Sequence, residues 1–156
     1  MFGLCPVAEL TLYDYWRSSS AYRVRIAMNL KGLEYRQVPV HLVRDGGQQH
    51  SPAYRALNPL GLVPALVHGD IVIVQSLAIC EYLEETQGGM PLLPGDPSGR
   101  ARVRALVQTV CSEIQPLNNL GVTRYLGDEM GQGKEQVRRW YAHWVERGFS
   151  ALEAWL

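Results

Sequence analysis

Three consecutive serines, Ser18, Ser19 and Ser20, are the side chains of this sequence whose type and position best suit chemistry. They stand between a short strand-like run and a segment with helical spacing. A hydroxyl at a helix N-terminus can donate a hydrogen bond to an anion, and the helix dipole stabilises the same negative charge. The residue types alone favour a simpler role, in which the serines only cap the helix and form the turn before it.

Cationic side chains flank the serines. Arg17 precedes them, and Arg23 and Arg25 lie on the segment that follows. Arginine binds carboxylates through two parallel hydrogen bonds, so Arg17 is our candidate contact for a carboxylate of a substrate. The alternative, equally open at this point, is that Arg17 is a solvated arginine of the loop. For Arg23 and Arg25 we expect structural ion pairs. The histidines lack the spacing of zinc ligands, and we expect no metal; they are His41, His50, His68 and His143.

The composition argues against several functional classes, namely nucleic-acid binders, membrane binders and membrane-spanning proteins. The chain has 156 residues, 47% of them hydrophobic, with 15 basic and 15 acidic side chains and no formal net charge. A binder of nucleic acid or anionic membranes would need an excess of Lys and Arg, so the balance argues against both partners. No apolar run approaches the roughly 20 residues of a membrane span, and residues 1–10 lack the basic part of a signal peptide. Because Cys5, Cys80 and Cys111 are widely spaced, we expect reduced thiols and a cytoplasmic protein.

Hydrophobic spacing in the first half of the sequence predicts four strands and two helices. They are strands at 10–13, 35–40, 64–68 and 71–74 and helices at 20–31 and 77–86. Gly32 suits the end of the first helix, Gly69-Asp70 predicts a two-residue hairpin turn, and Ser76 is expected to cap the second helix. The order β-α-β-β-β-α is that of a thioredoxin-like α/β domain, which we place at residues 8–89. That fold commonly carries a C-x-x-C motif, but serines stand here instead, so the chain has no pair of thiols at this position for disulfide exchange.

The second half predicts an all-helical domain at residues 95–156. Asp96 suits the cap of a helix with a continuous apolar face, and Pro116 should kink or end that helix. A last helix starts at Lys134 and reaches Leu156 without a stop signal. Its apolar face would have nothing after it, so we expect that the all-α domain is truncated.

Five segments, in order and at compatible spacing, resemble the zeta class of glutathione transferases. They are YWRSSSAYRVRIA at 15–27, DGGQQ at 45–49, NPLGLVPAL at 58–66, QSLAICEYLEE at 75–85 and IQPLNNL at 114–120. The first is similar to the family signature S-S-C-x-x-R-V-R-I-A. Ser20 stands where the family usually has Cys, and the chain stops before the family's last helices, which carry an Arg thought to hold a substrate carboxylate. The resemblance covers nearly the whole chain.

The resemblance implies a fold, a cofactor and an activity. The fold is that of glutathione transferases, here with an incomplete helical domain, and the cofactor is glutathione. The activity is cis–trans isomerisation of maleylacetoacetate to fumarylacetoacetate in tyrosine and phenylalanine breakdown, with glutathione transferase activity, in a cytoplasmic homodimer. Close variants isomerise maleylpyruvate or process haloacids, and the sequence does not separate these substrates. A catalytically impaired glutathione-binding protein is a further alternative.

The resemblance also implies a glutathione site around Ser18, which would hold the thiolate. Tyr13 and Tyr15 remain competing hydroxyls, as in tyrosine-type transferases. A cis bond at Val63-Pro64 would free the Val63 backbone to pair with the cysteinyl part. The implied catalytic residues are Ser18, Ser19 and Arg17. The implied glutathione-binding residues are Ser18, Ser19, Ser20, Gln49 (at the glycine end), Val63, Pro64, Gln75 and Ser76 (at the γ-glutamyl carboxylate), and Gln115 and Asn119.

Magnitudes support a serine-held thiolate. A thiol pKa of about 8.5 must fall by about two units for useful ionisation near pH 7, which corresponds to about 2.7 kcal/mol. A helix N-terminus supplies about 0.3–2 kcal/mol, and a hydroxyl that donates to the anion adds about 1.5–3 kcal/mol. The two effects together suffice without a Lys or His.

Overall fold

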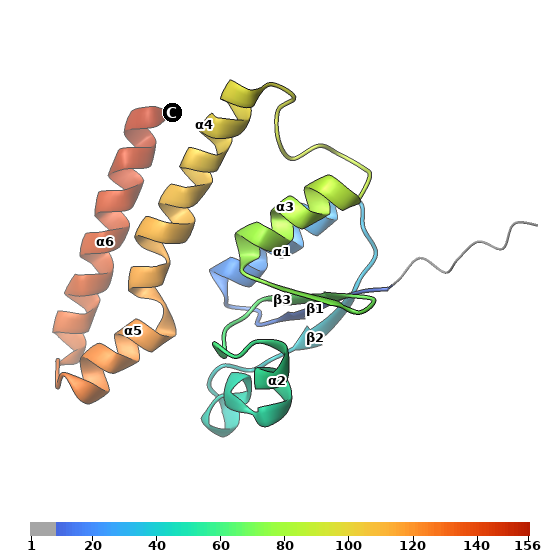
Figure 1. Cartoon of the computed structure of the whole chain (residues 1–156). Coiled ribbons are helices and arrows are strands. Elements are labelled where there is room, and N and C mark those ends of the chain that lie inside the picture. The colour runs from blue at the N-terminus through green and yellow to red at the C-terminus, as the bar shows by residue number, and fades with distance from the viewer. Residues whose placement is uncertain (1–8) are drawn as a thin grey trace, which may run out of the picture. The chain divides into compact units, whose positions relative to one another are not determined.

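The structure is a computed structural model that describes residues 9–156. Three features discussed above lie wholly or partly outside the described residues. They are Cys5, residue 8 at the start of the predicted α/β domain, and most of residues 1–10, which were considered as a signal peptide. The chain divides into two compact units that meet between Leu92 and Leu93. Each unit is described by itself, and both are seen in Figure 1.

The first unit is a four-stranded mixed sheet with helices on both faces. Its strands and helices are β1 (Leu10–Asp14), α1 (Ser19–Leu30), β2 (Arg36–Pro39), α2 (Pro52–Leu57), β3 (Ala65–His68), β4 (Ile71–Val74) and α3 (Ser76–Thr86). The strand order is β2-β1-β3-β4, in which β1 is parallel to β2 and antiparallel to β3, and β3 is antiparallel to β4. Helices α1 and α3 pack together on one face, and α2 lies beyond the other (Figure 1). The predicted thioredoxin-like fold class is confirmed.

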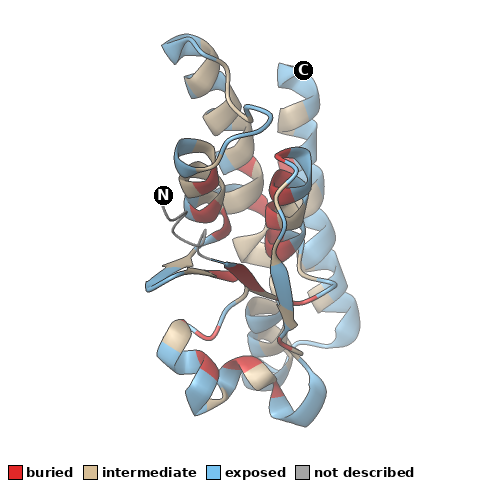
Figure 2. Cartoon of the chain, turned by 90° about the vertical axis from the view of Figure 1, so that its right-hand side faces the viewer, coloured by how far each residue is buried: buried red, intermediate tan, exposed pale blue. Residues whose placement is uncertain are grey.

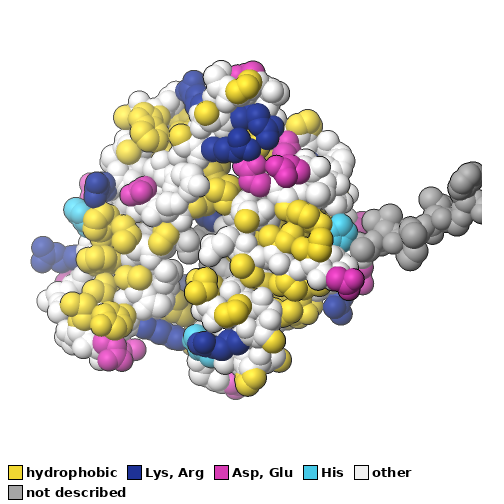
Figure 3. All heavy atoms as spheres, viewed as in Figure 1, with side chains coloured by type: hydrophobic (Ala, Val, Ile, Leu, Met, Phe, Trp, Pro, Cys, Tyr) yellow, Lys and Arg dark blue, Asp and Glu magenta, His cyan; other side chains and the backbone are white. Residues whose placement is uncertain are grey.

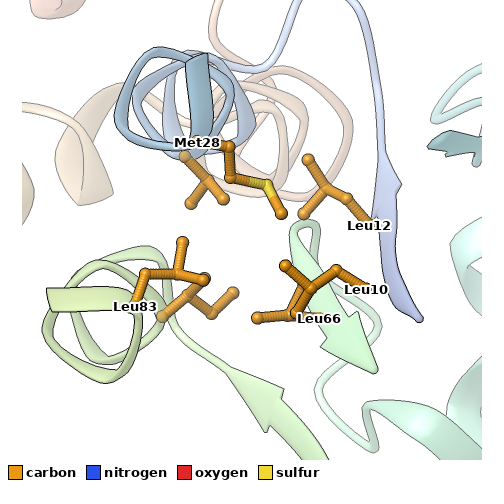
Figure 4. Close-up of a cluster of buried hydrophobic side chains, with 7 residues drawn as sticks. Leu10, Leu12, Met28, Leu66 and Leu83 are labelled. Atoms are coloured by element: carbon orange, nitrogen blue, oxygen red, sulfur yellow. The ribbon is translucent and has the colours of Figure 1, made fainter. Parts of the chain in front are cut away.

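Apolar side chains of β1, β3, α1 and α3 form the core between the sheet and the two helices. The cluster consists of Leu10, Leu12, Val24, Met28, Leu66, Ile79 and Leu83. Its side chains point toward one another in Figure 4, and Figure 2 shows the buried bands on the sheet and on the inner sides of the helices. Each fully buried side chain of this kind stabilises the fold by about 1.5–3 kcal/mol, so the cluster holds the strands and helices in place.

One local prediction in the first unit was wrong, and one helix of this unit was not predicted. Ser76 does not cap α3 but is its first residue, and Gln75 occupies the cap position without a side-chain cap bond. The polar stretch at residues 44–51 forms two short 3₁₀ turns, and the unpredicted α2 follows them. At six residues, α2 is too short to show helical periodicity, although Ser51 caps it and Pro52 takes its first position.

The second unit is all-helical, as predicted. It contains α4 (Pro97–Gln108), a π-helical stretch (Thr109–Ile114), a 3₁₀ turn (Pro116–Asn118), α5 (Leu120–Arg124), a second π-helical turn (Tyr125–Glu129) and α6 (Lys134–Trp155). Asp96 caps α4 by accepting a bond from the Gly99 N–H at 2.7 Å. The continuous helix ends before Pro116, whose ring nitrogen has no proton to donate.

The surface carries no broad area of one charge on the face shown in Figure 3, where basic and acidic side chains are mixed. Within residues 9–156, no helix is long and apolar enough to span a membrane. The same residues contain no group of three or more His, Cys, Asp or Glu side chains that could hold a metal ion.

Helix α6 packs closely against the π-helical stretch through a glycine. Gly148 is buried, and a Cβ added there would overlap Cγ1 and Cδ1 of Ile114. Trp140, two turns earlier on α6, donates from Nε1 to the Leu117 carbonyl at 2.8 Å. At this contact, α6 therefore lies so close to Ile114 that a Cβ at position 148 has no room.

We predict that Gly148→Ala destabilises the chain. Overpacking of a tight contact costs about 1–3 kcal/mol, which exceeds the gain of about 1 kcal/mol from the better helix propensity of alanine. Urea unfolding of Gly148→Ala and of Ser150→Ala, an exposed position on the same helix, measures the difference. A Gly148→Ala chain as stable as the unaltered one would contradict the close packing.

Candidate active site

The strand register brings several loops of the first unit to one end of the sheet. Ala65 of β3 lies opposite Tyr13 of β1 and Val74 of β4, and Tyr13 lies opposite Val38 of β2. Neighbouring strands are about 4.8 Å apart, so these residues form a continuous row. The loop that carries Ser18, the segment before β3 and the start of α3 all leave the sheet beside this row.

Ser18 is the N-cap of α1. Its Oγ accepts a hydrogen bond from the Ala21 N–H at 3.2 Å, and its own N–H donates to the Tyr15 carbonyl at 2.9 Å. A hydroxyl has one proton and two lone pairs, so the cap bond leaves the proton available to an incoming acceptor. Capping and anion binding are therefore compatible at Ser18. Ser19 is exposed in the first turn of α1, whereas Ser20 is buried.

The rings of the two competing tyrosines, Tyr13 and Tyr15, pack against other aromatic side chains and not against the start of α1. Leu12 packs in the core beneath α1, so Tyr13 points to the opposite face of the sheet, where its ring centroid lies 6.2 Å from that of Tyr54. Tyr15 is buried with its ring centroid 5.0 Å from that of His41. Of these three hydroxyls, the one at the start of α1 belongs to Ser18.

An ion pair holds the loop that presents Ser18. Asp14, only 1% exposed, pairs with Arg25 of α1 and accepts a second bond from Nε2 of Gln37 at 2.8 Å. Arg25 also donates to the Trp16 carbonyl at 3.2 Å. A buried carboxylate is tolerated only when it is paired and hydrogen-bonded, so this arrangement ties both ends of the loop to α1 and β2. The ion pair predicted for Arg25 is confirmed.

The ion pair predicted for Arg23 was wrong. Among residues 9–156, no carboxylate lies within salt-bridge distance of its guanidinium. Arg23 instead donates from Nη1 to the Ser76 hydroxyl at 2.6 Å. This bond joins α1 to the first residue of α3, which is 53 positions away in the sequence. No local pattern could have predicted that partner.

The segment before β3 offers a main chain without partners. The Val63–Pro64 peptide bond is cis, as the resemblance implied. Within the described part of the chain, neither the N–H nor the C=O of Val63 makes a hydrogen bond. Leu62, just before it, is held firmly, because its carbonyl accepts bonds from the Tyr54 hydroxyl and from Nδ2 of Asn58, each at 2.7 Å. The Val63 main chain is therefore presented on a fixed support.

The start of α3 combines a positive helix end with an unusual backbone. Gln75 has φ 71° and ψ 116°, a conformation that costs a residue with a side chain about 1–3 kcal/mol. The N–H groups in the first turn of α3 have no partner within the helix. Ser76 lies among them, 7% exposed, with Arg23 on its hydroxyl. Helix dipole and guanidinium both favour an anion at this position.

Comparisons with known proteins agree with this geometry. Residues 8–85 match the family described as Glutathione S-transferase, N-terminal domain. A probable maleylacetoacetate isomerase of Vibrio cholerae is 47% identical over 145 residues, which cover 93% of this chain and 67% of that protein. The chain belongs to the glutathione transferase family.

Similar solved structures indicate to which class of glutathione transferases the chain belongs. The maleylacetoacetate isomerase of Methylobacterium extorquens AM1, with bound malonate and glutathione, matches with TM-score 0.89 and 44% identity over 92% of this chain and 67% of that one. A maleylpyruvate isomerase, described as a bacterial glutathione S-transferase of the zeta class, matches with TM-score 0.88 and 44% identity over the same shares of both chains. This transferase chain is therefore a zeta-class member that spans about two thirds of the length of these relatives.

Glutathione, the cofactor of this family, fits the first unit of the transferase chain. The tripeptide has a central thiol, a peptide main chain and a charged γ-glutamyl end. At one end of the sheet the unit offers the Ser18 hydroxyl, the unpaired Val63 main chain and the positive start of α3 at Ser76. Each of these groups has chemistry that complements one part of the tripeptide.

Two further predicted residues, Gln49 and Arg17, contact other parts of the chain. Gln49 is 5% exposed and turned inward: its Nε2 donates to the Leu42 carbonyl at 3.4 Å, while its buried Oε1 has no partner among the described residues. Arg17 is exposed, with its guanidinium 5.6 Å from the Trp16 ring centroid. Their contacts with a ligand stay predictions.

Gln115 and Asn119 belong to the second unit. Asn119 caps α5 by accepting from the Val122 N–H at 3.0 Å, and it donates to the Pro116 carbonyl at 2.9 Å. Gln115 is half-buried at the end of the π-helical stretch. Local bonds thus account for the Asn119 side chain, and the ligand contacts of both residues stay predictions.

A hollow of about 550 Å³ in the first unit is not this site. It is lined by Glu9, Leu10, residues 32–36 and Gln87. Residues 32–36 follow the C-terminal end of α1, whereas Ser18 lies at the N-terminal end. The candidate active site is an open edge formed by loops and helix starts, which requires no enclosed cavity.

Tyr54 is a supporting residue that sequence reasoning missed, because no periodic pattern marked it. We predict that Tyr54→Phe, which removes one of the two donors to the Leu62 carbonyl, lowers the free energy of unfolding by about 0.5–1.5 kcal/mol near neutral pH. Burial, and to a lesser degree the charge of Tyr13, raises the pKa of Tyr54 far above its ordinary value of 10.0. Its contribution is complete below about pH 10 and is lost as the pH rises toward the folded-state value.

Urea unfolding of both proteins at neutral and alkaline pH measures this effect. Above about pH 10 the unaltered chain should lose more stability than Tyr54→Phe, while Tyr35, whose pKa burial also raises, remains in both proteins. Equal stability and equal pH dependence of the two chains would show that the bond to Leu62 contributes nothing.

Proposed function

We propose that this chain catalyses the glutathione-dependent cis–trans isomerisation of maleylacetoacetate to fumarylacetoacetate. The observation that carries the proposal is the Ser18 hydroxyl at the start of α1, whose cap bond to the Ala21 N–H leaves its proton available. The named relatives support the choice of reaction. When bound, glutathione supplies a thiol whose ionised form is a nucleophile toward an electron-poor double bond.

The chain's own residues provide the electrostatics. Ser18 donates its hydroxyl proton to the sulfur anion, and the α1 dipole stabilises the same charge. Ser19 and Ser20 line the first turn beside it. The Val63 main chain holds the peptide part through backbone bonds, next to Pro64. Because Asp14 and Arg25 hold the loop before Ser18, the hydroxyl is in place before any ligand arrives.

The other ligand contacts complete the proposed site. Gln75 and the N–H groups of Ser76 and its neighbours bind the γ-glutamyl carboxylate. Gln49 is the proposed contact at the glycine end, whose carboxylate can accept a bond from its amide Nε2. For Gln115 and Asn119, the resemblance alone supports a contact with glutathione.

Arg17 is the proposed contact for a substrate carboxylate. It is exposed and carries no ion pair among residues 9–156, so its guanidinium can bind a carboxylate bidentately. Maleylpyruvate offers a similar carboxylate and cis double bond, and a relative that isomerises it makes it the alternative substrate. Haloacid processing is a further alternative that no observation on this chain favours.

We also propose a role for each domain, an oligomeric state and a cellular location. Residues 8–89 act as the glutathione-binding domain and residues 95–156 as the all-α domain. The active form is a homodimer in the cytoplasm, with no nucleic-acid or membrane partner. The resemblance and the balanced charge of the chain support these assignments.

The purified chain, mixed with glutathione and maleylacetoacetate, should produce a glutathione-dependent change in ultraviolet absorbance. We predict that Ser18→Ala lowers kcat/KM by about 10–100-fold, the loss expected when one hydrogen bond to a charge is removed. Ser18→Thr, which keeps a hydroxyl, should lose less. Full activity in Ser18→Ala, or no glutathione-dependent turnover by the unaltered chain, would refute the proposed function.

A control separates chemistry from stability. Ser18→Ala also removes a helix cap, which costs about 1 kcal/mol. Asp96→Ala removes the cap of α4, a helix of the other unit, at a comparable cost. Thermal melts should show similar losses in both variants, but only Ser18→Ala should lose turnover.

A further inference from the structure

Arg23 differs from the two other cations, Arg25 and Lys31, that tie α1 or its C-cap to neighbouring elements. Arg25 pairs with Asp14, and Lys31 pairs with Glu84 at 3.0 Å. Arg23 is half-buried, and within residues 9–156 its guanidinium has no carboxylate partner. A partly desolvated charge without a counter-ion is unfavourable, so its position calls for an anion from outside the chain.

The bond from Arg23 sets the direction of the Ser76 hydroxyl. Nη1 of Arg23 donates to Ser76 Oγ at 2.6 Å, so one lone pair of that oxygen is occupied and the hydroxyl proton must point to another acceptor. Donation from a cation also makes the hydroxyl a better donor. A carboxylate that accepts from Ser76 would lie within about 5 Å of the guanidinium, the sum of two hydrogen-bond lengths.

We propose that Arg23 is a positioning residue for the carboxylate at the γ-glutamyl end of the bound tripeptide. This inference rests on the proposed function. Arg23 orients the Ser76 hydroxyl and adds a fixed positive charge behind the α3 N-terminus, where the helix dipole acts in the same sense.

The placement of Arg23 also links the two ends of the site. It follows Ser18 by five positions on α1, which is about 7 Å along the helix axis. Helix α1 therefore presents the Ser18 hydroxyl to the thiol and also carries Arg23, which orients the Ser76 hydroxyl toward the carboxylate. Lys31, the C-cap of α1, bonds to Glu84 of α3 and so ties the other ends of the two helices together.

Isothermal titration calorimetry on the full chain tests the proposal with two ligands. One is glutathione, and the other is γ-aminobutyryl-cysteinylglycine, which lacks only the γ-glutamyl carboxylate. Arg23→Met should raise the Kd of glutathione by about tenfold or more but leave the Kd of the analogue within about twofold. Arg23→Lys keeps the charge and should fall between the unaltered chain and Arg23→Met.

Lys31→Met is the matched control, because it also removes a cationic tie between α1 and α3. It should lower the thermal midpoint while leaving the ratio of the two Kd values unchanged. Equal losses for both ligands in Arg23→Met and Arg23→Lys, or no loss for either, would overturn the role of Arg23 while the proposed function stands. Failure of the unaltered chain to bind glutathione would overturn both.

Discussion

The candidate site depends on the register of one central strand. Leu66 of β3 lies opposite Leu12 of β1, and both side chains are completely buried in the core. That pairing puts Ala65 between Tyr13 and Val74, and with it the segments that carry Val63 and Gln75. A slip of one residue would turn every side chain of β3 to the other face, so the buried leucines forbid it. The packing of the core thus determines where the ligand-binding groups lie.

Electrostatic pre-organisation is the second feature that the site needs. The N-termini of α1 and α3 lie at the same end of the sheet, so the positive ends of both helix dipoles face that end. These dipoles attract an anion even though the chain has no net positive charge. Asp14 and Arg25 neutralise each other while they hold the loop before Ser18. A chain with equal numbers of acidic and basic residues can therefore bind an anionic tripeptide through local fields.

Much of this arrangement could be predicted from residue patterns. Alternating and helical spacing predicted the four strands and the helices α1 and α3, and glycines marked their ends because only Gly adopts φ near 60° without cost, as at Gly32 and Gly69. The serine segment indicated chemistry, and the resemblance to a family turned that indication into a defined site. The cis bond at Val63–Pro64 came from the resemblance alone.

What could not be predicted depends on contacts between distant residues. Ser76 was expected to cap α3, but its hydroxyl oxygen accepts a bond from Arg23 of another helix, and Gln75 adopts the cap position with a positive φ. Tyr54 supports the segment before β3 from a helix that was not predicted at all. Neither feature leaves a periodic trace in the sequence, because each follows from how the sheet brings separate loops together.

The central claim is that Ser18 and the α1 dipole stabilise a sulfur anion. A titration of the ultraviolet absorbance of the thiolate, with glutathione saturating the chain, tests it most directly. The account predicts a pKa for the bound thiol at least about one unit below that of free glutathione in the same buffer, with most of the shift absent in Ser18→Ala. A bound thiol that ionises at the same pH as the free one would contradict the account.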